Sequence, residues 1–182
     1  MAQPANILNQ NISIKRLQEM RNFGGEILTH GLKEEILKKF ISHDQNLRSA
    51  IESAYEHFVV LQKEKPDFLL LSEKEQIKLA QKNIVNFYAN ENVNPYVAIS
   101  AMGPWIVTLK GAVIYDCGGY GMLGLGHSPK LALNEIKKPH VMANVMTPSL
   151  SQMEFISILK KEIGHSRTNK STFTEFCCLS SG

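Results

Sequence analysis

The sequence has few of the features that mark secreted, membrane-spanning or metal-binding proteins. Its three cysteines, Cys117, Cys177 and Cys178, are odd in number and have no disulfide or metal-ligand spacing. No apolar run reaches the roughly 18 residues that a membrane span requires. The N-terminus also lacks the positively charged start and apolar block of a secretory signal. We therefore expect a cytoplasmic protein without a membrane partner.

An excess of charge of one sign is also missing. Residues 1–90 contain 12 Lys+Arg and 11 Asp+Glu, and residues 91–182 contain 8 and 6, for a formal net charge of +3. Neither half has a basic stripe that could neutralise a phosphate backbone, so we expect no nucleic-acid partner. At 182 residues the chain is near the usual size of one domain.

Apolar residues recur at spacings of three and four from about residue 11 to residue 89, which predicts several amphipathic helices. Gly24 and Gly25 are expected to end the first helix, and residues 43–46 to break or bend the second. Ser72 and Glu75 match a capping box, which predicts the start of a third helix. The side chains expected along its buried side are Ile77, Ala80, Ile84, Phe87 and Tyr88.

The pattern changes at residues 91–95, where turn-forming residues predict a boundary between a helical N-terminal extension, 1–90, and a second part, 91–182. Residues 105–109 and 112–116 are apolar, β-branched runs, which predict a β-hairpin turning at Lys110-Gly111. We expect one helix to begin at Ser128 as N-cap with Pro129 as its first residue. A second is expected from the Ser149–Gln152 capping box to Gly164, and a strand at residues 172–179.

A glycine-rich stretch follows the hairpin, with glycines at positions 118, 119, 121, 124 and 126. Glycine allows the backbone to approach a ligand closely, so this is a candidate ligand loop; a simple connection between two elements is the alternative. Gly119, Gly121 and Gly124 have the spacing of a dinucleotide-binding fingerprint. However, the first signal for the next helix comes only at Ser128, and no acidic residue follows at the expected distance. No Gly-Lys-Ser or Gly-Lys-Thr of a P-loop occurs either. A nucleotide-binding module is therefore the alternative hypothesis.

Two side chains of the stretch each have two possible roles. Tyr120 lies between glycines, so its hydroxyl can project towards a substrate, or its ring can pin the loop to the core. His127 precedes Ser128, where a hydrogen bond to the start of the helix is favoured over a catalytic role.

Beyond Pro95 these parts form an ordered set, which is a hairpin, a glycine loop, two helices and a strand. The residues that mark it are Tyr115-Asp116, Leu125-Gly126-His127, Pro129 and Ser181-Gly182. The set resembles the N-terminal portion of class III (fold type I) pyridoxal-phosphate-dependent aminotransferases. The resemblance implies an α/β fold, mixed α+β as truncated, that begins the large domain of such an enzyme. It also implies a homodimer that uses pyridoxal 5'-phosphate to move an amino group from an amino acid or amine to a 2-oxo acid.

The resemblance implies site residues as well. The family's Ser-Gly turn binds the cofactor phosphate, which gives Gly182 and Ser181 a cofactor-binding role. A strand that continues into a helix through Ser-Gly presents unpaired backbone N–H groups to an anion, in agreement with that role. The family's glycine loop lies at the active-site entrance, which makes Tyr120 a substrate-binding residue.

The departures from the family are equally informative. The sequence has no lysine in a context that matches the Schiff-base lysine, and it contains neither the aromatic residue that stacks on the pyridine ring nor the aspartate that pairs with the ring nitrogen. We therefore expect a truncated or split chain that is inactive alone. A helical interaction protein with a vestigial C-terminal part is the third hypothesis.

Overall fold

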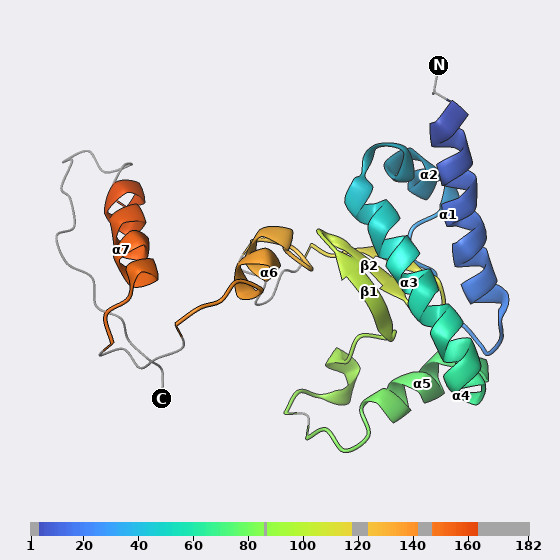
Figure 1. Cartoon of the computed structure of the whole chain (residues 1–182). Coiled ribbons are helices and arrows are strands. Elements are labelled where there is room, and N and C mark those ends of the chain that lie inside the picture. The colour runs from blue at the N-terminus through green and yellow to red at the C-terminus, as the bar shows by residue number, and fades with distance from the viewer. Residues whose placement is uncertain (1–3, 86, 118–123, 142–146, 164–182) are drawn as a thin grey trace. The chain divides into compact units, whose positions relative to one another are not determined.

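The computed structural model describes residues 4–85, 87–117, 124–141 and 147–163 (Figure 1). Contacts divide the chain into two units, Met1–Leu133 and Asn134–Gly182. The compositional boundary at residue 90 therefore falls inside the first unit. The strand expected at residues 172–179 lies outside the described residues.

The first unit begins with several helices, as the apolar periodicity predicts. They are α1 (Pro4–Asn22), α2 (Glu34–His43), α3 (Gln45–Glu64), α4 (Pro66–Leu70) and α5 (Glu73–Ala80), followed by the 3-10 helix η1 (Asn90–Asn92). Both predicted breaks are confirmed. Helix α1 ends just before Gly24 and Gly25, and Asp44 separates α2 from α3. The Asp44 carboxylate caps α3 by accepting hydrogen bonds from the backbone N–H groups of Asn46 (2.8 Å) and Leu47 (3.3 Å).

Helix α5 starts as predicted and ends early. The Ser72–Glu75 capping box is present in both directions, but the helix stops at Ala80 instead of continuing to Tyr88. Asn83 takes a left-handed φ of +69°, which cannot continue a right-handed helix. The apolar residues beyond it are consequently exposed, with Phe87 86% exposed.

The buried face of α5 also differs from the prediction. Glu73 and Gln76 are buried, whereas Ile77 is half-buried and Ala80 is exposed. Glu73 is held by backbone N–H groups of the loop after α1, and Gln76 Nε2 donates to the carbonyl of Phe68 (2.9 Å). Specific polar partners therefore orient α5, and its apolar side faces outward.

A three-stranded antiparallel sheet completes the first unit, in the order β1 (Ala98–Met102), β2 (Trp105–Thr108), β3 (Val113–Tyr115). The predicted hairpin of β2 and β3 is confirmed, with Trp105 opposite Tyr115 and Val107 opposite Val113. Strand β1 was not predicted, because its sequence, AISAM, contains a single β-branched residue.

The hairpin turn is longer than the predicted two-residue turn. The N–H of Thr108 donates to the carbonyl of Ala112 and the N–H of Gly111 donates to that of Thr108, both at 2.9 Å. Gly111 takes a φ of +70°. A type I turn followed by a left-handed residue is the common three-residue hairpin loop, and it explains why glycine stands at this position.

Helix α3 lies against the sheet and shares one core with it (Figure 1). Its buried stripe is Leu47, Ala50, Ile51, Ala54 and Phe58. The sheet and its turn contribute Trp105, Val107, Leu109 and Val113 to the same core. The helical region and the hairpin are therefore one folded body.

The remaining helices are α6 (Lys130–Ile136), which begins in the first unit and ends in the second, and α7 (Leu150–Glu162), in the second. The Ser149 hydroxyl accepts a hydrogen bond from the N–H of Gln152 (3.2 Å), so the predicted start of α7 is confirmed. The helix ends at Glu162, and its C-cap is Ile163, one residue before the Gly164 predicted as C-cap. Neither helix has a buried residue among those described.

At the coarse level the described residues form a mixed α/β protein, with helices and a small antiparallel sheet. None of the described helices has the length and apolar character needed to cross a membrane.

Candidate functional site

The two ends of the glycine-rich stretch are held together by Gly103, Asp116 and His127, which we call its closed base. Gly103, in the turn between β1 and β2, pairs with His127 through two backbone hydrogen bonds, N–H to carbonyl in each direction, at 2.9 and 2.8 Å. Gly126 fits closely against this turn, because a Cβ on Gly126 would lie 3.0 Å from backbone atoms of Gly103. The exit of the stretch is thereby fixed to the sheet.

The side chains of Asp116 and His127 close the same base. Nε2 of His127 lies 3.0 Å from Oδ2 of Asp116, and the two side chains are only 26% and 23% exposed. Asp116 directly follows β3, and its N–H donates to the carbonyl of Pro104 (2.7 Å). A carboxylate can only accept, so Nε2 carries the donated hydrogen. One hydrogen bond thus joins the two ends of the stretch that contains Tyr120.

These contacts correct two expectations at the start of α6. His127 bonds to Asp116 instead of the start of the helix. Ser128 does not act as the N-cap, because its hydroxyl donates to the carbonyl of Ala101 (2.9 Å) and its φ is +49°. The helix begins one residue later than predicted, at Lys130. Both residues therefore attach the end of the glycine stretch to the β1–β2 region.

Asp44 connects this region to the helices. Besides capping α3, its carboxylate accepts a hydrogen bond from the indole N–H of Trp105 (2.7 Å). The Trp105 ring packs edge-on against Phe40 and Tyr115, each with ring centroids 5.0 Å apart. The sequence pattern of residues 43–46 predicts only a helix break. An aspartate there was the available signal, but its tryptophan partner is 61 residues away.

Lys110 and Glu73 form a buried polar cluster below the hairpin turn. The Lys110 ammonium donates to the carbonyls of Gly24, Leu69 (2.9 Å) and Leu71 (2.7 Å). Oε2 of Glu73 accepts from the N–H groups of Leu28 (2.7 Å) and Thr29 (2.8 Å). Burial lowers the pKa of Lys110, and the charge of Glu73 acts in the opposite direction. The cluster joins the turn to three other segments, and no local sequence pattern predicts that this lysine is buried.

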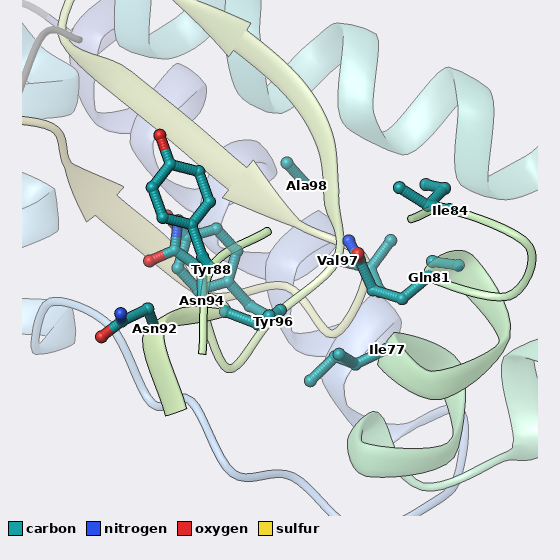
Figure 2. Close-up of a pocket in the computed structure, with 11 residues that line it drawn as sticks. Ile77, Gln81, Ile84, Tyr88, Asn92, Asn94, Tyr96, Val97 and Ala98 are labelled. Carbon is teal, nitrogen blue, oxygen red and sulfur yellow. The ribbon is translucent and has the colours of Figure 1, made fainter. Parts of the chain in front are cut away.

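A pocket of about 480 Å³ lies between α5 and the segment that leads into β1 (Figure 2). In Figure 2 the rings of Tyr88 and Tyr96 lie on one side of it, and Ile77, Gln81 and Ile84 lie on the other. Burial raises the pKa of Tyr96, and the charge of Asp116 acts in the same direction.

The resemblance gives roles to three residues. Tyr120, Ser181 and Gly182 lie outside the described residues. Gly119 and Gly121 lie outside them as well, while Gly124 is described and takes a φ of +72°. Within the described ranges no cluster of His, Cys, Asp or Glu could hold a metal ion.

We predict that the Asp116–His127 contact stabilises the base. The variants His127→Ala and Asp116→Asn should each lower the free energy of unfolding by about 1–2 kcal/mol, because each removes a charge-assisted hydrogen bond between two largely buried side chains. Urea denaturation of the full chain measures this loss. Glu52→Gln is the matched control, since it alters the more exposed pair with Arg16 and should change the value by less than about 0.5 kcal/mol. Equal losses in all three variants would contradict the assignment.

Comparison with protein-family models, curated proteins and solved structures found no match for the chain.

Proposed function

We propose that this chain carries the active-site entrance segment of a class III pyridoxal-phosphate-dependent aminotransferase. The reaction would be transfer of an amino group from an amino acid or amine to a 2-oxo acid by a homodimer. The observation that carries the proposal is the closed base of the glycine stretch, formed by Gly103, Asp116 and His127.

The closed base supports an entrance role for a physical reason. A loop that contacts a substrate needs both of its ends held by a rigid scaffold, so that the residues between them stay near the site. Asp116 holds one end at β3, and His127 holds the other through Gly103. Tyr120, between these ends, is the residue that we propose contacts the substrate carboxylate.

The described residues do not by themselves fit the cofactor. Pyridoxal phosphate supplies an electron sink when a lysine amine binds its aldehyde. Lys110 is the one buried lysine of the described residues, and its three N–H donors are used by three backbone carbonyls. An ammonium held in this way has no lone pair with which to attack an aldehyde. The other described lysines are exposed. No step of amino transfer is therefore assigned to this chain.

We predict that the purified 182-residue chain has no transaminase activity. With added pyridoxal phosphate it should show no visible aldimine band that borohydride removes, and no amine-dependent turnover of a 2-oxo acid. An intact aminotransferase assayed in parallel is the control. A borohydride-sensitive band together with turnover would contradict this prediction.

A second measurement tests the family itself. The gene should continue beyond the codon for Gly182, in some reading frame, with Ser-Glu-Ala and a distant lysine. Unrelated sequence in every frame would remove the proposal.

The nucleotide-binding alternative has less support from the geometry. A dinucleotide fingerprint needs parallel strands and a helix that opens on the third glycine. The described sheet is antiparallel throughout, and α6 begins six residues after Gly124.

A further inference from the structure

Two neighbouring cavities lie along the outward side of α5. The pocket of about 480 Å³ in Figure 2 and a second one of about 620 Å³ share the lining residues Ile77, Gln81, Ile84 and Val93. Both volumes fall in the range of small-molecule sites. Because α5 is oriented by its buried Glu73 and Gln76, the apolar side chain of Ile77 is left to line this surface.

The first cavity is lined entirely by uncharged side chains. Its apolar part includes Ile77, Ile84 and Val97, and its polar groups are amides and the phenols of Tyr88 and Tyr96. Removing a charged ligand group from water into such a lining would cost free energy without compensation. The lining therefore favours the uncharged, mostly apolar part of a ligand.

The second cavity adds positive charge. Lys74 and Lys78 line it from the same face of α5, four residues apart. Neither forms an ion pair with any residue that the structure describes. Glu75 also lines this cavity, but its carboxylate accepts hydrogen bonds from the N–H (3.0 Å) and hydroxyl (2.6 Å) of Ser72 in the capping box. Together with the Ser72 hydrogen bonds, the charge of Lys78 lowers the pKa of Glu75. The lining therefore holds two lysines and one carboxylate, an excess of one positive charge that can attract an anionic group.

We propose that this face binds a small amphiphilic carboxylate. The apolar body occupies the uncharged cavity against Ile77 and Ile84, and the carboxylate lies over Lys74 and Lys78. The charge complementarity of the two cavities carries the assignment, which is independent of the proposed transaminase function.

Octanoate and 1-octanol, titrated into the full chain by calorimetry, separate the two parts of the site. Octanoate should bind more tightly than the alcohol. A Lys74→Gln/Lys78→Gln double variant should weaken octanoate binding by about three- to tenfold and leave octanol binding unchanged, because only the carboxylate meets the lysines. Lys82→Gln is the matched control: Lys82 is exposed, lines neither cavity, and its substitution should have no effect.

A change in the apolar cavity should affect both probes. Ile84→Asp is expected to weaken octanoate and octanol by about tenfold or more, whereas Leu79→Asp, on an exposed residue that lines neither cavity, should not. Circular dichroism melting checks the fold of each variant, and Ile84→Asn replaces Ile84→Asp if the latter melts early. Absence of octanoate binding at millimolar concentration would overturn the proposal. Equal losses in the control variants would also overturn it, as would a dimer in sedimentation that Ile84→Asp dissociates.

Discussion

A Lys110→Met variant is expected to lose about 3–5 kcal/mol of free energy of unfolding. Lys110 is only 2% exposed, and its ammonium donates to three carbonyls on two segments, the loop after α1 and the end of α4. Methionine fills a similar volume but donates no hydrogen bond, so these acceptors would be left buried without this partner. The Glu73 carboxylate would also lose its nearby cation. This loss is a large fraction of the 5–15 kcal/mol typical of a whole domain.

Urea denaturation followed by circular dichroism measures the loss, with Lys82→Met as the exposed control, expected to change stability by less than about 0.5 kcal/mol. A Lys110→Met/Glu73→Gln double variant should recover about 1–2 kcal/mol relative to Lys110→Met alone, because it also removes the uncompensated charge. If Lys110→Met unfolds at the same urea concentration as the wild type, the buried cluster does not contribute as described.

The same cluster shows where sequence reasoning reached its limit. Lysine in a hairpin turn is ordinarily solvated. Local signals predicted the position of the turn correctly, although its loop is one residue longer than predicted. The burial of Lys110 depends on carbonyls 39, 41 and 86 residues away. No local pattern encodes those partners, so the position of the turn was predictable and the role of its lysine was not.

The prediction for helix α5 was partly wrong for a related reason. Its start was predictable because a capping box is local, with donor and acceptor three residues apart. Its buried face was not, since Glu73 and Gln76 are buried through partners in the loop after α1 and in α4. The apolar periodicity that continued past Ala80 describes the surface of the two neighbouring cavities instead of the core.

In the candidate site, the elements were predictable and the contacts between them were not. The hairpin and the glycine stretch follow from β-branched runs and glycine content, which are properties of short segments. The pairing of Asp116 with His127 depends on the unpredicted β1, because the turn between β1 and β2 carries Gly103, to which His127 is bonded. Because strand β1 was not predicted, the contacts that join the two ends of the glycine stretch were not predicted either.

The helical region should not fold without the sheet. A fragment of residues 1–90 would expose the α3 stripe that includes Leu47, Ile51 and Phe58, and it would lose the contact between Asp44 and Trp105. Exposing these three large side chains costs about 4.5–9 kcal/mol at roughly 1.5–3 kcal/mol each, which is comparable to the total stability of most domains. We therefore expect residues 1–90 to show no cooperative urea transition and a poorly dispersed amide spectrum.

A fragment of residues 1–133 is the matched control, because it keeps the sheet, the Lys110 cluster and the Asp116–His127 base. It should unfold cooperatively with a stability within about 1–2 kcal/mol of the first unit in the full chain, since the described residues of α6 that it loses are not buried. Cooperative unfolding of residues 1–90 alone would contradict the shared core and would favour an independent helical interaction module. Failure of both fragments would instead show that the first unit needs residues beyond 133. The expected result, a folded 1–133 and an unfolded 1–90, would mean that the helices act as part of the scaffold that holds the glycine stretch.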